Sequence, residues 1–206
     1  MEVYTTETDQ INAIKHFFVN NGKYLAVGIV LGIGAIVGWN YWQSHQTNQL
    51  QDTATAYEKI NTSLASGSKE GITAAEKFAN ETNNIYGVIT DMQLAKHAVD
   101  ENNLAQAEKY LLLASGKTKD PDMLALTNIR LARVQLAEDK TDAALKTLEQ
   151  VKSTGWQVAV NDLRGDILAK KGNIKGAREA YSSGLTAQGS QALKMLMQIK
   201  LDNLSN

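Results

Sequence analysis

The feature that most constrains this chain is a long stretch without charged residues, from Tyr24 to Trp42. As a helix it would measure about 28 Å, close to the hydrocarbon thickness of a bilayer of about 30 Å. Aromatic side chains stand at both ends, Tyr24 at one and Trp39 with Trp42 at the other, and such rings favour the level of the lipid headgroups. We therefore predict a transmembrane helix over residues 24–42.

A core helix of a soluble protein or a cleaved signal peptide can also contain an apolar stretch. The length of this stretch and its aromatic flanks disfavour a core helix. A cleavage site needs small residues after the apolar core, whereas bulky aromatic residues follow this one. The stretch is therefore expected to be an uncleaved signal anchor.

Basic residues next to the span predict its orientation. Lys15 and Lys23 precede the span, whereas residues 43–58 contain no lysine or arginine. Positively charged flanks stay in the cytoplasm. We therefore expect residues 1–23 to form a short cytoplasmic tail and residues 43–206 to form a domain on the other side of the membrane.

The tail carries an apolar pattern of its own. Its large apolar residues are spaced to share one face of a short helix: Ile11, Ile14, Phe17 and Phe18. The pattern predicts an amphipathic helix that lies along the inner surface of the membrane, in contact with lipid. Asparagine and glycine at residues 20–22 are expected to end this helix.

Four glycines in the span form two pairs, and the two glycines of each pair stand four positions apart. The first pair is Gly28 and Gly32, and the second is Gly34 and Gly38. Because small residues let another helix approach closely, each pair is a candidate contact with a membrane helix of a partner. The alternative is that glycine is simply frequent in spanning helices.

Composition narrows the chemistry of the remaining chain. The absence of cysteine excludes disulfides, zinc–thiolate sites and thiol catalysis. The net charge of −1 gives no indication of nucleic-acid binding. A single proline, together with abundant alanine, leucine, glutamine and lysine, favours an all-α fold.

An internal repeat organises residues 43–206. Three segments share one order of residue sizes: a small residue, a second small residue on the following helix, a large residue one turn later, and a small residue after that. The three sets are Ala95, Ala107, Leu111 and Ala114; Ala132, Ala144, Leu148 and Val151; and Gly165, Ala177, Tyr181 and Gly184. A helix–turn–helix repeat of roughly 34 residues resembles the tetratricopeptide repeat.

Turn-forming residues separate the two helices of each segment. They stand at residues 102–103, 139–141 and 172–173. Asp120 followed by Pro121 predicts a helix start, because aspartate caps a helix well and proline is tolerated in its first turn.

Further helices are expected on both sides of the three clear repeats. Residues 46–65, continuing from the membrane, and residues 72–83 would form a degenerate first hairpin. Residues 191–204 would form a final helix that caps the stack with one apolar side. That side comprises Leu193, Leu196, Met197 and Leu201. The expected fold is all-α, with one N-terminal transmembrane helix followed by a tetratricopeptide-like, right-handed solenoid of helical hairpins.

No constellation for catalysis stands out. His16, His45 and His97 fall on opposite sides of the predicted membrane or far apart in the repeat pattern, so a metal site is not expected. Neither a nucleophile motif nor a phosphate-binding loop occurs, and we expect no cofactor. We predict that the protein is not an enzyme and acts by binding. A membrane-anchored enzyme would instead require a polar pocket with convergent titratable groups.

The resemblance to tetratricopeptide domains implies where binding would occur. In such domains the first helix of each hairpin lines a concave groove. Carried over by register, the groove positions are Met92, Lys96, Ile129, Arg133, Asp162 and Asp166. The carboxylate-clamp version of the groove uses lysine and asparagine, and this sequence departs from it. The alternative is that these are ordinary residues of the repeat.

The whole chain resembles the YfgM-type family of ancillary subunits of the bacterial SecYEG translocon. The resemblance is carried by AVGIVLGIGAIVGWNYWQSHQ in the span, by AEKFA, NIRLARVQLAEDKTDAALKTLE and NDLRGDILAKKGNIKGAREAY in the repeats, and by LMQIKLDNL near the C-terminus. It implies a single-pass inner-membrane protein of a Gram-negative bacterium, with a periplasmic tetratricopeptide-like domain.

The partners implied by this resemblance are SecYEG and the membrane-anchored chaperone PpiD. Proteins of the family are thought to help hand newly translocated chains to periplasmic chaperones, so direct contact with translocating polypeptides is a further expectation. Because repeat domains are reused freely, a membrane-anchored scaffold for another cell-envelope complex is the alternative function.

Overall fold

The computed structural model describes residues 7–204, which contain nine α-helices, one short 3₁₀ helix and no strand. The predicted all-α class is therefore confirmed. Residues 1–6 of the predicted cytoplasmic tail and residues 205–206 lie outside this description. The chain divides into two compact units, with the boundary between Thr53 and Ala54.

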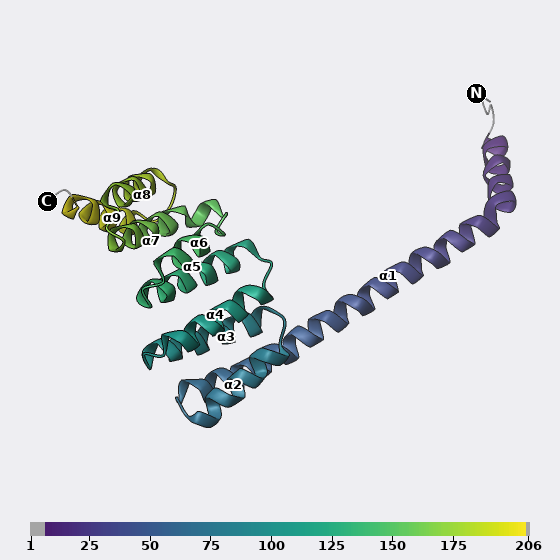
Figure 1. Cartoon of the computed structure of the whole chain (residues 1–206). Coiled ribbons are helices and arrows are strands. Elements are labelled where there is room, and N and C mark those ends of the chain that lie inside the picture. The colour runs from purple at the N-terminus through teal and green to yellow at the C-terminus, as the bar shows by residue number, and fades with distance from the viewer. Residues whose placement is uncertain (1–6, 205–206) are drawn as a thin grey trace. The chain divides into compact units, whose positions relative to one another are not determined.

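Helix α1, Glu7–Ala65, contains the predicted span within one long helix (Figure 1). Among the described residues it is the one helix that is long and apolar enough to cross a membrane. Its apolar side chains are not covered by protein; Leu31 is 68% exposed and Ile36 is 64% exposed. Such a surface needs an apolar solvent, which agrees with the predicted single N-terminal membrane helix.

The expected end of the amphipathic helix at residues 20–22 is wrong, because α1 continues through them. The amide nitrogen of Asn21 donates to the carbonyl oxygen of Phe17 at 3.0 Å, a bond within the helix rather than a cap. Figure 1 shows α1 bending in its purple N-terminal part instead of ending there. Weak helix formers lower the stability of a helix without terminating it.

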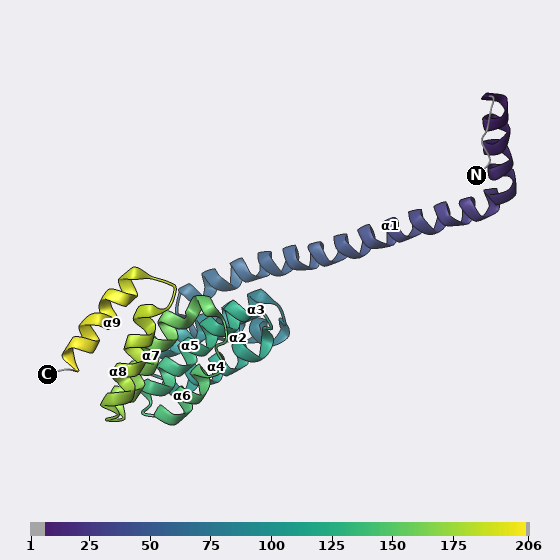
Figure 2. The ribbon, with the colours of Figure 1, turned by 90° about the horizontal axis from the view of Figure 1, so that it is seen from above.

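Successive helical hairpins make up the second unit, and they follow one another in chain order (Figures 1 and 2). The end of α1 precedes α2, Lys69–Glu81, and the next pairs are α3, Ile85–Asp100, with α4, Leu104–Lys117; α5, Pro121–Ala137, with α6, Thr141–Leu148; and α7, Gln157–Lys170, with α8, Ile174–Thr186. The 3₁₀ helix η1, Thr154–Trp156, precedes α7, and α9, Gln191–Asn203, is the last helix.

The predicted turns are confirmed at equivalent places in the three repeats. Asn102, Asp139 and Gly172 have φ angles of 59°, 62° and 77°, the left-handed conformation that ends many helices. The next N–H group then bonds back into the helix, as from Lys140 to the carbonyl of Gln135 at 2.8 Å. At the predicted start of α5, Asp120 accepts bonds from the N–H groups of residues 122 and 123.

The twelve residues that define the repeat are all buried. One of them, Gly165, packs so closely that an added Cβ atom would lie 2.2 Å from Cε1 of Tyr181. The small residue on α7 thus makes room for the large residue on α8. Two more residues of the same pattern, Ala144 and Leu148, are 0% exposed.

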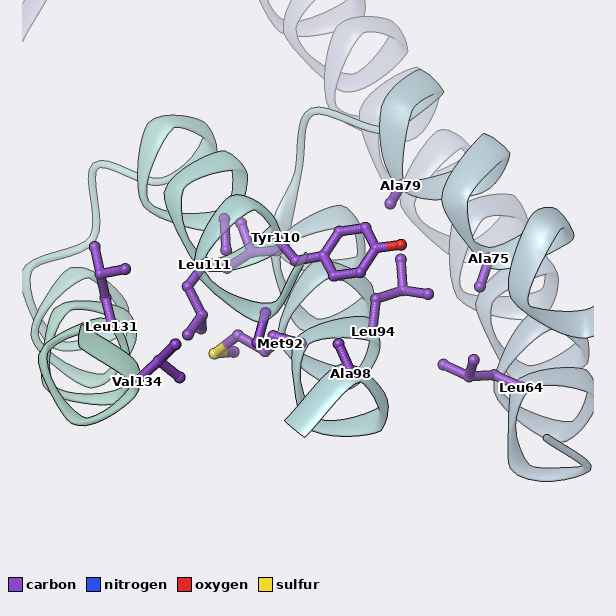
Figure 3. Close-up of a cluster of buried hydrophobic side chains, with 14 residues drawn as sticks. Leu64, Ala75, Ala79, Met92, Leu94, Ala98, Tyr110, Leu111, Leu131 and Val134 are labelled. Carbon is purple, nitrogen blue, oxygen red and sulfur yellow. The ribbon is translucent and has the colours of Figure 1, made fainter. Parts of the chain in front are cut away.

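Three apolar clusters run through the stack and share helices. The first extends from Leu64 at the end of α1 to Leu131 and Val134 in α5 (Figure 3). The second joins α5, α6 and α7, and the third joins α7, α8 and α9. Each hairpin therefore buries apolar surface against its neighbours as well as between its own two helices, as in other repeat proteins.

Helix α9 packs against α8 and α7. The prediction that Leu196 lies on the packed side of α9 is wrong. Leu196 is 46% exposed, whereas Met197 is 0% exposed. Because a helix turns about 100° per residue, Leu193, Met197 and Leu201 point one way and Leu196 lies off that line. Leu204, one further turn along, joins the packed side instead.

Candidate functional site

Three of the six predicted groove positions, on α3 and α5, border a cavity of about 380 Å³. Met92 and Lys96 line it from α3, and Arg133 lines it from α5. The register of the repeat thus brings together three of the six predicted residues. The remaining wall residues are Ala95, Val99, Leu104, Leu111, Arg130, Val134 and Ala137.

The walls of this cavity are mainly apolar and its cationic groups are exposed. Figure 3 shows the sulfur of Met92 directed toward Leu111 and Val134. That sulfur accepts weak hydrogen bonds from Oγ1 of Thr127 at 3.7 Å and from Nη1 of Arg130 at 3.6 Å. Arg130 and Arg133 are exposed. An apolar hollow bordered by cations suits binding of a partner's side chains better than catalysis.

A second hollow of about 250 Å³ adjoins the first, and Lys96 lines both. It lies between the end of α1 and α3, where the side-chain amide of Gln93 donates to Oδ1 of Asn61 at 2.8 Å. The same amide donates to the hydroxyl of Tyr57 at 3.0 Å. The hollowed surface therefore continues from α5 across α3 to the first hairpin.

Ile129, the fourth predicted position, lines neither hollow and faces the next hairpin, so its prediction as a groove residue is wrong. It is 2% exposed and packs in the cluster that joins α5, α6 and α7. The outward position near it is taken by Arg130, which the register of the repeat did not indicate. A phase error of one residue is small in sequence but rotates a side chain by about 100° on a helix.

The last two predicted positions, Asp162 and Asp166, meet a residue of α9. The Nζ atom of Lys200 lies 2.7 Å from Oδ1 of Asp162 and 2.8 Å from both carboxylate oxygens of Asp166. The hydroxyl of Tyr181 also donates to Asp166, at 2.7 Å. Burial and this hydrogen bond raise the pKa of Tyr181 above its usual value.

Lys200 is held in its charged form by this arrangement. Burial by itself lowers the pKa of Lys200, but the hydrogen bonds to Asp162 and Asp166 outweigh it, and the pKa is raised. The side chain of Asp162 is only 7% exposed. In this part of the repeat domain the carboxylates already have an internal cation. No local sequence pattern signals the pair, because the register of α9 relative to α7 depends on tertiary packing.

The four glycines of the span leave open surface on α1. At Gly28, Gly32, Gly34 and Gly38, an added Cβ atom would meet no atom within 4 Å apart from the adjoining backbone of its own helix. Contact between these glycines and a partner's membrane helix stays a prediction.

Within residues 7–204, no group of three or more histidine, aspartate, glutamate or cysteine side chains is placed to hold a metal ion. His45 is exposed, and His97 lines the hollow between α1 and α3 with Asp100.

Comparison with known proteins agrees with the geometry of the repeat. The profile of a family described as a tetratricopeptide repeat-like domain matches residues 15–206. A protein of Escherichia coli K12 named ancillary SecYEG translocon subunit is 45% identical over 205 residues, covering 100% of both chains. Proteins of the same name from Aggregatibacter actinomycetemcomitans and Haemophilus influenzae are 33% and 30% identical, each covering 98% of this chain and 99% of its relative. No solved structure gives a significant match.

The length of these matches confirms the family resemblance and the tetratricopeptide-like fold. They include the span as well as the hairpins, since the profile begins at residue 15 and the E. coli relative is matched in full. The chain therefore belongs to the family of ancillary SecYEG translocon subunits, membrane-anchored proteins with a tetratricopeptide repeat-like domain.

Proposed function

We propose that the protein is a non-enzymatic subunit associated with the Sec translocon of a bacterial inner membrane. Full-length similarity to relatives named ancillary SecYEG translocon subunit is the observation that carries this proposal. The exposed apolar surface of α1 supports an anchor in the lipid, and the open hollows along α3 support partner binding by the repeat domain.

In the proposed orientation the N-terminus is cytoplasmic and the hairpins are periplasmic. Lys15 and Lys23 support it, because basic residues before a span favour the cytoplasmic side. This orientation puts the repeat domain on the side where translocated chains emerge. The absence of cysteine suits a compartment in which stray thiols would be oxidised.

The proposed role is to assist the handover of translocated chains to a periplasmic chaperone of the PpiD type. Lys96 and Arg133 are exposed at the open part of the candidate groove, and the buried Met92 lines the cavity there. Asp162 and Asp166, the corresponding positions on α7, are paired with Lys200 of α9. A domain of this kind would bind the chaperone, the emerging chain, or both.

Co-purification tests the proposal. The full chain, tagged at its C-terminus, is recovered from membranes solubilised in a mild detergent, and the bound proteins are identified. We expect SecY, SecE and SecG together with a PpiD-type chaperone. Recovery of the intact chain without translocon subunits would contradict the proposal, and recovery of a different envelope complex would favour a scaffold for that complex.

A double substitution in the span tests whether its first glycine pair contributes to translocon binding. Gly28→Leu with Gly32→Leu is expected to reduce translocon recovery if this glycine pair contacts a partner's helix, because leucine keeps the helices apart. Val30→Leu with Ile36→Leu is the matched control, since it alters side chains that are already large and exposed. Unchanged recovery in both variants would exclude the first glycine pair as a contact.

A further inference from the structure

Two pairs of helices, α3 with α5 and α7 with α9, occupy corresponding places in the sequence repeat but carry different charged residues. Met92 on α3 and Asp162 on α7 occupy the same place in the repeat, each three residues before the first small residue, Ala95 or Gly165. Arg130 stands 38 residues after Met92, and Lys200 stands 38 residues after Asp162. Each cation bonds to its earlier partner across two neighbouring helices of the stack.

At the α7/α9 pair the cation is fully satisfied by carboxylates. Lys200 bonds to Asp162 and Asp166, which lie one turn apart on α7. Its side chain is 25% exposed, and the ring of Tyr181 lies beneath it, with the ring centre 5.8 Å from Nζ. This pair shows what the repeat geometry accepts at that place: an acidic group opposite a basic one.

At the α3/α5 pair the acidic groups are missing. The partner of Arg130 is the thioether of Met92, at 3.6 Å, and a thioether is a weak acceptor. The place of Asp166 is taken by Lys96, a second cation. The carboxylate beside Lys96 is that of Asp100, 2.6 Å away, and both of these side chains are largely exposed. Within the described chain, neither Arg130 nor Arg133 forms an ion pair.

At the α3/α5 pair, where these carboxylates are absent, there is an open apolar cavity. The cavity of about 380 Å³ lies beside Lys96, Arg130 and Arg133, and Val99 on its wall is 41% exposed. A volume of this size lies in the range of pockets that hold ligand groups, from about 300 Å³. The site therefore offers apolar walls for one side chain and guanidinium groups for a neighbouring anion.

We propose that this cavity binds a segment of a partner protein in which an apolar side chain is flanked by aspartate or glutamate. The side-chain carboxylate lies opposite Arg130 and Arg133, as Asp162 and Asp166 lie opposite Lys200, and the apolar side chain fills the cavity. The inference rests on the proposed binding role of the groove and names the chemistry that the groove selects.

Fluorescence anisotropy with a defined peptide tests the selection. The probe is a fluorescein-labelled peptide, blocked at both ends, with one leucine flanked by two glutamates, and it is titrated with the full chain in detergent at low salt. We expect saturable binding that is at least tenfold tighter than binding of the same peptide with glutamines. Because the carboxylate contacts are exposed at the rim, added salt should weaken binding.

Protein variants assign the binding to the cavity. Arg130→Met with Arg133→Met should weaken binding of the glutamate peptide at least tenfold and leave the glutamine peptide unchanged. Arg164→Met is the matched control, because Arg164 does not line the cavity, and it should bind like the parent chain. Circular dichroism of each variant should match that of the parent and so confirm that all are folded.

Three outcomes would overturn the proposal. Equal binding of the glutamate and glutamine peptides would remove the role of the carboxylate. Binding only of a glutamine peptide with a free C-terminus would assign the site to a terminal carboxylate instead. Absence of binding to every peptide would remove the cavity as a peptide site, and continued co-purification with the translocon would then show that the proposed function stands without it.

Discussion

Gly165→Ala is expected to destabilise the repeat domain by about 3 kcal/mol, at the upper end of the cost of overpacking a core. The added Cβ atom would lie 2.2 Å from Cε1, 2.5 Å from Cδ1 and 2.6 Å from Cζ of Tyr181. The ring has little freedom to move, because its hydroxyl is bonded to Asp166. Thermal unfolding followed by circular dichroism should show a midpoint lowered by several degrees, at about 2–4 °C per kcal/mol for a domain of this size.

Gly116→Ala is the matched control for that substitution. Gly116 is an exposed residue of α4, and an added Cβ atom would meet no atom within 4 Å apart from the adjoining backbone of its own helix. Alanine forms helix better than glycine, so this variant should be as stable as the parent or more stable by about 0.5–1 kcal/mol. Equal effects of the two substitutions would contradict the close packing of α7 against α8.

Lys200→Met should destabilise the C-terminal end of the stack by about 2–3 kcal/mol. The substitution leaves the carboxylates of Asp162 and Asp166 without a cation. Breaking a buried ion pair lowers the free energy of unfolding more than breaking an exposed one does. The pKa of Lys200 is raised above 10.5, so the lysine is charged in the folded and unfolded chain at pH 8, and its stabilising effect is fully present there. Urea unfolding at pH 8 measures the loss.

Two further variants separate the ion pair from general effects of losing a lysine. Lys96→Met breaks a pair whose side chains are 75% and 59% exposed, and it should change stability by less than about 0.5 kcal/mol. Adding Asp162→Asn and Asp166→Asn to Lys200→Met should recover part of the stability, because the uncompensated charge is removed. A Lys200→Met chain as stable as the parent would show that the pair contributes nothing.

The hairpins were predictable because their information is local. Small and large residues recur at fixed places, as at Ala107 and Leu111, and the structure buries them as the pattern requires. The turns are predictable from asparagine, aspartate and glycine, the residues that adopt positive φ most readily. Positive φ at Asn102 and Gly172 follows directly from these preferences.

Features that depend on phase or on distant packing were less predictable. The helix end expected at residues 20–22 is absent because asparagine and glycine only weaken a helix. The apolar character of Leu196 predicts a place on the packed side of α9, yet the direction of that side is set by contact with Met197 and its neighbours. Local patterns give the period of a helix accurately and its rotation only to within about one residue.

The same limits apply to the candidate groove. Register alone placed Met92, Lys96 and Arg133 around one cavity, because these positions recur with the repeat. Ile129, by contrast, lies in the core, and Arg130 beside it lines the cavity. The pairing of Lys200 with an aspartate of α7 joins residues 38 apart in sequence and requires the packing of α9 on α7. Long-range pairs of this kind have no local signature.

In-cell photo-crosslinking most directly tests whether the open groove faces the translocon machinery. In otherwise unchanged full-length protein, a photoreactive amino acid replaces Val99 in the cavity wall. In the control it replaces Lys175 on α8, which does not line the cavity. We predict that Val99 yields adducts with a translocon subunit, a PpiD-type chaperone or a chain in transit, and that Lys175 yields few of these. Adducts from Val99 with cytoplasmic proteins alone, or with an unrelated envelope complex, would contradict the proposed function.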